Sequence, residues 1–129
     1  MKIKSILERN PIIPAIKDNI TLEKALNSNS EIVFIILANI VNIKEYCDKL
    51  REKNKVIYIH IDMIDGLNST NNGIDYIMNT IKPDGILTTK SNVVAHAYKN
   101  NISVIQRFFI LDTLSYEKAL SNIKENKII

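Results

Sequence analysis

Five short apolar runs, each followed by an amphipathic stretch, constrain the fold of this chain more than any other feature. The runs are rich in Ile and Val and lie at 11–16, 32–38, 56–62, 85–89 and 102–109. Continuous apolar runs of this length are typical of buried parallel strands. The stretches between them carry apolar residues at helical spacing, as Ile43, Cys47 and Leu50 do. The sequence therefore predicts alternating strands and helices of the α/β class, behind a short N-terminal helix.

Right-handed crossovers leave two architectures for such a chain. One is an open, five-stranded, doubly wound sheet of the flavodoxin-like type, which 129 residues fill comfortably. The other is a TIM-barrel-like (β/α) fold with about five of the eight units of a complete barrel. The runs recur roughly every 23 residues, so a complete barrel would need about 185 residues. The barrel interpretation therefore implies that about three units are absent.

The polarity of the third run distinguishes these architectures. One parity of this run is Ile57, Ile59 and Ile61, and the other is Tyr58, His60 and Asp62. A central strand of a doubly wound sheet is covered by helices on both faces and should be apolar on both. A barrel strand packs its outer face on helices, and its inner face can become polar near the ligand end. The alternation favours a single, incomplete TIM-barrel-like domain over residues 1–129.

Composition excludes several classes of protein. The net charge of +3, from 17 basic and 14 acidic residues, lacks the concentrated basic character of a stand-alone nucleic-acid module. The single cysteine, Cys47, excludes an internal disulfide and a multi-cysteine zinc site, and three glycines leave no glycine-rich phosphate loop. No apolar run approaches the roughly 20 residues that span a bilayer, and no signal peptide opens the chain. We expect a soluble, cytoplasmic protein without membrane contact, resident metal or cofactor.

Polar residues lie near the ends of the apolar runs or just after them, where parallel strands of either fold present their ligand site. The candidate ligand-binding residues are Lys17, Asn39, His60, Asp62, Lys90, Gln106 and Arg107. Lysine and arginine neutralise a phosphate, and arginine can do so with two parallel hydrogen bonds. Carboxylate and amide groups bind hydroxyls, and a helix beginning near Ser91 adds free N–H groups. This set predicts a small, anionic, polyhydroxylated ligand.

Two other functions are compatible with parts of this pattern. A receiver domain phosphorylated on Asp62 would fit the length, but it needs an acidic pair after the first strand and a lysine after the fifth. Here the first strand is followed by Lys17 and a single acid, and the fifth by Arg107. A phosphosugar-handling TIM-barrel enzyme could use Asp62 as a base and Lys90 as a cation or Schiff-base lysine. Lys90, however, begins a helix at the rim, where desolvation is small.

Four segments resemble one known family in sequence, order and spacing. They are Pro11–Lys17, His60–Gly66, Ile81–Ser91 and Ile105–Asp112. Together they resemble the glycerol-3-phosphate-responsive antiterminator family over essentially the whole chain after residue 10. The resemblance implies a TIM-barrel-like fold without enzymatic activity. It also implies that the protein senses glycerol 3-phosphate and then acts on the leader mRNA of glycerol-utilisation genes to prevent early termination.

The chain departs from that family at its end. Family members continue past the positions that match Ile128 and Ile129 into further strands, so the resemblance is to a C-terminally truncated member. A barrel fragment of five units would leave the outer edges of its first and last strands unpaired. We therefore expect marginal stability or association with another chain, including a homo-oligomer.

Overall fold

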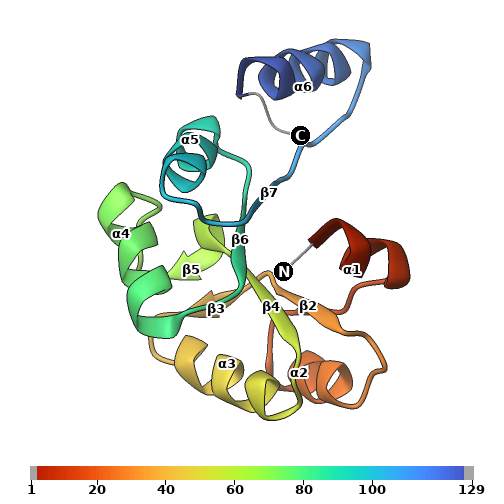
Figure 1. Ribbon diagram of the computed structural model, residues 1–129, viewed down its shortest axis with the longest axis vertical. Coiled ribbons are helices and arrows are strands. Elements are labelled where there is room, and N and C mark those ends of the chain that lie inside the picture. The colour runs from red at the N-terminus through yellow and green to blue at the C-terminus, as the bar shows by residue number, and fades with distance from the viewer. Residues whose placement is uncertain (1–2, 127–129) are drawn as a thin grey trace.

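The computed structural model describes residues 3–126 and contains a parallel sheet with helices along its length. The sheet comprises β1 (Ala15–Ile16), β2 (Ile32–Ile35), β4 (Val56–His60), β6 (Gly85–Thr88) and β7 (Val104–Gln106). The helices are α1 (Ile3–Arg9), α2 (Asn19–Leu26), α3 (Ile43–Glu52), α4 (Asn71–Tyr76), α5 (Ser91–Lys99) and α6 (Thr113–Asn126) (Figure 1). All five predicted strands and the short N-terminal helix are present.

The order of the strands decides between the two predicted architectures. The five strands lie side by side in chain order, β1-β2-β4-β6-β7, and every neighbouring pair is parallel. A doubly wound sheet places its first strand inside the sheet and reverses direction at a switch point. Here β1 is at one edge and no reversal occurs, so the flavodoxin-like alternative is wrong. Successive units advance around one curved sheet, as in a TIM barrel.

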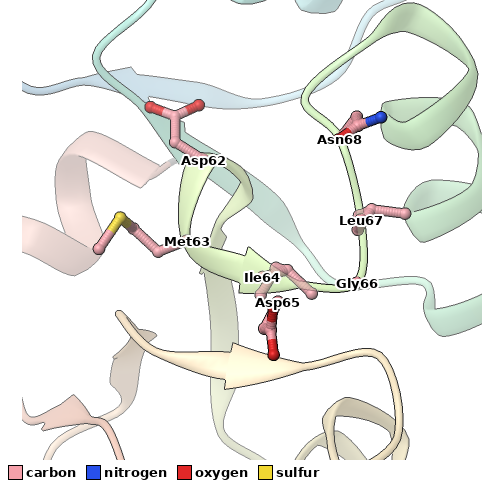
Figure 2. A pocket seen from close by; sticks show the side chains of 7 residues that line it. All are labelled: Asp62, Met63, Ile64, Asp65, Gly66, Leu67 and Asn68. Carbon is pink, nitrogen blue, oxygen red and sulfur yellow. The ribbon is translucent and has the colours of Figure 1, made fainter.

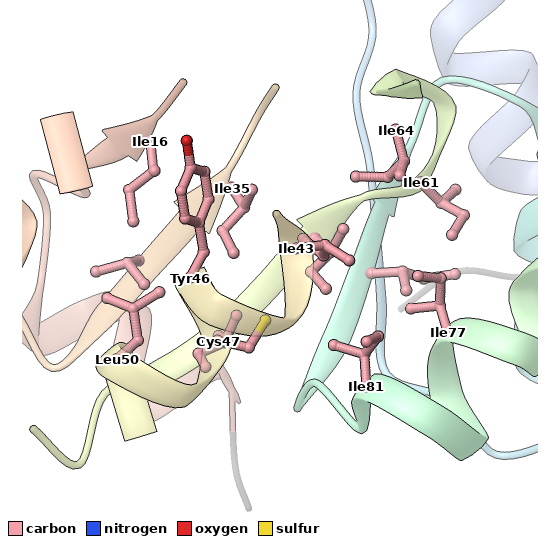
Figure 3. Close-up of a cluster of buried hydrophobic side chains, with 14 of the residues drawn as sticks. Ile16, Ile35, Ile43, Tyr46, Cys47, Leu50, Ile61, Ile64, Ile77 and Ile81 are labelled. Carbon is pink, nitrogen blue, oxygen red and sulfur yellow. The ribbon is translucent and has the colours of Figure 1, made fainter. Parts of the chain in front are cut away.

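The two faces of the sheet are covered differently, as the alternation in β4 predicts. Ile57 and Ile59 point into a core of nineteen buried residues that α2, α3, α4 and α5 also line (Figure 3). Tyr58 points to the opposite face, into a second core of only four buried residues, which includes Ile6 of α1. The helices that connect the strands therefore lie on the outer face, and α1 covers part of the inner face.

Gly85 permits the close contact between β4 and β6 on the inner face. It is the register partner of Tyr58 in the neighbouring strand. A Cβ atom on Gly85 would lie 2.4 Å from Cε2 of Tyr58 and 2.6 Å from the carbonyl oxygen of Ser103. Both distances are too short for any side chain, so the tyrosine ring occupies the space that glycine leaves.

Several strands are shorter than the apolar runs that predict them. Beyond β2, residues Ala38–Asn39 form β3, which pairs in parallel with β5 (Ile64–Asp65) in a separate two-stranded sheet. Beyond β4, the chain turns into the 3₁₀ helix η1 (Ile61–Met63), and α4 continues as the π-helical turn η2 (Ile77–Ile81). Apolar residues continue through these turns because Ile61, Ile64 and Ile77 remain buried in the outer core.

The β7 side of the molecule exposes many apolar side chains. Between α1 and β7 lies a groove of about 830 Å³, lined mainly by apolar residues that include Leu7, Ile105 and Phe108. Leu111 is 88% exposed and Leu114 of α6 is 61% exposed. In Figure 1, α6 stands beyond β7, and it contacts α5. Within residues 3–126, no helix is long and apolar enough to cross a bilayer.

Candidate functional site

Hydrogen bonds join the carboxyl ends of β4 and β6. The Oδ1 atom of Asp62, in η1, accepts a hydrogen bond of 2.8 Å from the hydroxyl of Thr88. Its Oδ2 atom accepts bonds from the backbone N–H and the hydroxyl of Thr89, at 2.8 and 3.0 Å. Three donors on the end of β6 thus hold a carboxylate that follows β4, although 26 residues separate Asp62 from Thr88.

The end of β7 joins the same cluster. The backbone N–H of Arg107 donates to the carbonyl oxygen of Thr88 at 2.8 Å. The side-chain amide of Gln106 donates to the hydroxyl of Ser91, the first residue of α5, at 3.3 Å. No side chain within the described part caps the N-terminus of α5. The ends of three strands and the start of one helix therefore meet at one place, which we call the mouth cluster: His60, Asp62, Thr88, Thr89, Gln106 and Arg107.

His60, the last residue of β4, is a buried member of this cluster. Its side chain is 2% exposed, and its Nδ1 atom is 4.0 Å from Oδ2 of Asp62 without a hydrogen-bond partner among the described residues. Burial lowers the pKa of His60; the Asp62 carboxylate opposes this shift, and the positive charge of Arg107 adds to it. The imidazole is therefore neutral at neutral pH and has a ring nitrogen available.

The predicted cations occupy different places. Arg107 is exposed beside the mouth, with its guanidinium 5.3 Å from the centre of the Phe109 ring. The ammonium of Lys90 donates to the hydroxyl of Ser69 at 2.6 Å, across the loop that precedes α4. Lys17 is exposed after β1, at the far edge of the sheet, where its backbone N–H donates to the Thr21 hydroxyl. Of the three, Arg107 belongs to the mouth cluster and Lys90 flanks it.

Asn39 lies in the two-stranded sheet beside the mouth. Its Oδ1 atom accepts hydrogen bonds from the backbone N–H groups of Val41 and Asn42, at 2.9 and 2.8 Å. It therefore shapes the turn before α3 with its oxygen. Its register partner Asp65 belongs to the loop 62–68, which lines an open pocket of about 410 Å³ (Figure 2). In Figure 2, the side chains of Asp62 and Asp65 point in different directions from this loop.

The structure thus brings together four of the seven predicted residues, namely His60, Asp62, Gln106 and Arg107, with Lys90 adjacent. It does not bring Lys17 to them. The prediction omitted the roles of Thr88 and Thr89 as donors to Asp62 and of Ser69 as the partner of Lys90. The sequence offered one signal for the threonines, their position at the end of the fourth apolar run. Their hydroxyl groups alone indicate no binding role, because such side chains are common at any helix start.

Other reactive side chains are arranged for packing or local structure. Cys47 is fully buried on the inward face of α3, and burial raises the pKa of its thiol to about 12. Asp18 caps α2, because its Oδ1 atom accepts the backbone N–H of Thr21 at 2.8 Å. Within residues 3–126, no three His, Cys, Asp or Glu side chains are grouped so as to hold a metal ion.

The chain is similar in sequence to one curated protein and in structure to two solved proteins. The chain is 29% identical over 116 residues to the uncharacterized protein YgcP of Escherichia coli K12, which covers 90% of this chain and 61% of that protein. A glycerol uptake operon antiterminator regulatory protein from Listeria monocytogenes superposes with a TM-score of 0.82 at 26% identity, over 89% of this chain and 62% of that chain.

A second solved structure, a glycerol uptake operon antiterminator-related protein from Thermotoga maritima, has a TM-score of 0.81 at 26% identity. The match covers 90% of this chain and 65% of that chain. This chain therefore spans about three fifths of the length of the relatives it matches. The family model described as glycerol-3-phosphate responsive antiterminator matches residues 12–128. The chain belongs to the glycerol-3-phosphate responsive antiterminator family.

Proposed function

We propose that this chain is a ligand-responsive regulator that binds glycerol 3-phosphate at the mouth cluster and acts on the leader mRNA of glycerol-utilisation genes as an antiterminator. Its membership of the antiterminator family supports the regulatory role. The observation that carries the ligand site is the meeting of the β4, β6 and β7 ends, where an arginine, a buried histidine and a tethered carboxylate converge.

Each residue has a proposed part in holding the ligand. Arg107 and the uncapped N-terminus of α5 would bind the phosphate, because both present N–H donors and positive charge. Asp62 and the buried Oε1 atom of Gln106, which has no partner among the described residues, would accept hydrogen bonds from the glycerol hydroxyls. Lys90 would contribute charge by leaving Ser69, and Lys17 and Asn39 remain outer contributors. The ligand serves as a regulatory signal, with no cofactor or metal.

The hydrogen bonds around the mouth support binding rather than catalysis. Both carboxylate oxygens of Asp62 accept bonds from threonines, and the ammonium of Lys90 is exposed and bonded to Ser69. The threonine donors occupy both oxygens of Asp62, and the ammonium of Lys90 is bonded to Ser69, so neither group is positioned for proton abstraction or Schiff-base formation. We accordingly propose a non-enzymatic, single barrel-like domain that works with RNA in the cytoplasm.

Self-association is part of the same proposal. Among residues 3–126, β1 and β7 each have one neighbour in the sheet, so each presents an edge that no described strand pairs. Exposed strand edges favour pairing with another chain. We expect the sedimentation coefficient of the 129-residue chain to rise with protein concentration. A single monomeric species over a hundredfold concentration range would remove the homo-oligomer from the proposal.

The ligand proposal is tested by calorimetric titration of the folded chain with glycerol 3-phosphate, with glycerol and inorganic phosphate as controls. Saturable binding of the phosphorylated polyol, with neither control competing well, supports the site. Absence of binding by a chain that circular dichroism shows to be folded contradicts it. The RNA role is tested separately, by transcription through a glycerol-operon leader in vitro. Read-through that rises only when both protein and ligand are present supports antitermination, and unchanged read-through contradicts it.

A further inference from the structure

We infer that His60 takes up a proton when a phosphorylated polyol binds at the mouth cluster, and that this step makes the site selective for the phosphate-bearing ligand over the free polyol. The inference deepens the proposed function and rests on it. It begins from one structural fact: an imidazole with 2% of its side chain exposed has a ring nitrogen, Nδ1, that no described residue satisfies.

A buried polar atom without a partner costs free energy, so its retention calls for a specific reason. Nδ1 of His60 is 4.0 Å from Oδ2 of Asp62, too far for a hydrogen bond. Asp62 cannot turn toward the ring without cost, because Thr88 and Thr89 hold both of its oxygens. The ring is therefore placed next to an anion whose oxygens are bonded to the threonines, and its buried nitrogen is left without a partner among the described residues.

Burial keeps His60 neutral in the unliganded protein. It lowers the pKa of the imidazole, the Asp62 carboxylate opposes this shift, and the guanidinium of Arg107 adds to it. The register partner of His60 in β6 is Leu87, which belongs to the inner core together with Tyr58 and Ile32. The ammonium of Lys90 is turned away toward Ser69. Asp62 and Arg107, two groups of opposite sign, are thus the charged groups that modify the effect of burial on this histidine.

A phosphate dianion beside Arg107 would change that balance in one direction. It would offset the positive charge that disfavours the imidazolium, and it would attract the imidazolium directly. The neutral ring would then accept one proton from solvent, and the charges of the phosphate and of Asp62 would stabilise the imidazolium. Glycerol has no charge and would leave the histidine neutral. The selectivity therefore comes from the protonation that only the anion induces.

The chain offers an internal control for observing this step, because it has only two histidines. The second, His96 in α5, has its Nε2 atom 2.9 Å from Oδ1 of Asp75 and its side chain 14% exposed. It lies on the outer helices, away from the mouth. Nitrogen-15 NMR of the imidazoles during a pH titration would follow both rings, and His96→Gln would assign the signals. With saturating glycerol 3-phosphate, we expect the titration midpoint of His60 to rise by about one pH unit or more, whereas adding the ligand at fixed pH should not move the His96 signal.

Calorimetry in two buffers of different ionisation enthalpy gives an independent measure. Glycerol 3-phosphate that binds as the dianion releases some protons of its own at about pH 6.5, because the second phosphate pKa is near 6. The wild-type chain should add to this release an uptake of protons at His60. His60→Gln keeps a donor but cannot titrate, so it should lose that uptake and bind the ligand about tenfold or more weakly. His96→Gln should behave as the wild type.

The outcomes of these experiments distinguish the inference about His60 from the proposed binding of glycerol 3-phosphate. Binding of glycerol 3-phosphate with an unchanged His60 titration, or with equal proton uptake in His60→Gln, overturns the inference and leaves the sensor proposal intact. Absence of binding by the folded wild-type chain overturns both. A risen His60 midpoint with glycerol alone would overturn the selectivity argument, because a neutral ligand would then suffice.

Discussion

The Oδ1 atom of Asp62 lies 2.8 Å from the hydroxyl oxygen of Thr88, and this bond fastens η1 to the end of β6. Asp62→Asn replaces one of the two accepting oxygens with a donor that faces other donors. Because bonds to a charged group are stronger than neutral ones, we expect the free energy of unfolding to fall by roughly 1.5–3 kcal/mol. Affinity for glycerol 3-phosphate should fall roughly tenfold. Urea denaturation and calorimetry measure the two effects.

Asp65→Asn is the matched control for that variant, since Asp65 is exposed on the same loop. It should change the free energy of unfolding by less than about 0.5 kcal/mol. If both variants have the same small effect, the bonds between Asp62 and the threonines do not join β4 to β6 in solution.

Arg107→Ala separates ligand affinity from stability. The guanidinium is exposed and lies 5.3 Å from the centre of the Phe109 ring, so its loss should cost at most about 1 kcal/mol of unfolding free energy. Affinity for glycerol 3-phosphate should fall about tenfold or more, because a charged phosphate partner is removed. Arg9→Ala removes an exposed arginine that pairs with Glu31 at 2.9 Å, before the start of β2, and serves as the control. Equal affinity in all three proteins would exclude Arg107 from the site.

His60 should make the protein sensitive to mild acid. Burial lowers its pKa in the folded chain, so below the ordinary histidine value of about 6.5 the unfolded chain binds more protons than the folded chain. The stability is complete above that value and should decline as the pH falls from it toward the folded pKa. Denaturation curves between about pH 7.5 and pH 5 would show the decline, since unperturbed carboxyl groups titrate lower.

His60→Gln should flatten this decline. Several carboxyl groups also lose stabilising hydrogen bonds in acid, because those bonds lower their pKa values; they are Asp18, Glu31, Asp48 and Asp112. Their contribution falls away below the ordinary carboxyl range, near pH 4. A decline of the same size in His60→Gln would assign it to other groups.

Gly85→Ala tests the contact between β4 and β6. Its Cβ atom would lie 2.4 Å from the Tyr58 ring, so we expect overpacking to reduce the free energy of unfolding by about 1–3 kcal/mol. In a Tyr58→Leu background the ring is gone but the Ser103 carbonyl, 2.6 Å from the same Cβ position, remains, so the cost should shrink without vanishing. Equal costs in both backgrounds, by urea denaturation, would mean that the ring yields freely.

The barrel-type sheet was predictable because the side chains of one strand, β4, alternate between the two faces of the sheet. Ile57 and Ile59 against Tyr58 and His60 indicate a helix-covered outer face and a polar inner end, and the structure has both. The ends of the strands were not predictable to the same degree. Ile61 is as apolar and as buried as Ile59, yet it lies in a 3₁₀ helix, since periodicity reports burial and not backbone geometry.

The candidate site likewise was predictable from the sequence in part. The polar residues near the ends of the apolar runs were expected at one edge of the sheet. The structure places four of them there, namely His60, Asp62, Gln106 and Arg107. The sequence could not show that the oxygen of Asn39 is used by the backbone of Val41 and Asn42, because asparagines in turns and in sites look alike in sequence. It also could not show that Lys90 reaches Ser69, a contact between residues 21 apart that depends on how two loops fold.

The position of β7 has a consequence for how this molecule moves. β7 has three half-buried residues, and β6 is its one neighbour in the sheet, whereas β4 has five residues between two neighbours. Backbone amides of β7 should therefore exchange with deuterated water much sooner than those of β4, through local opening that leaves the rest folded. Gln106 and Arg107 leave the mouth whenever β7 opens. A ligand that holds these two residues must suppress this local unfolding. Ligand binding therefore orders β7, the strand that leads to α6.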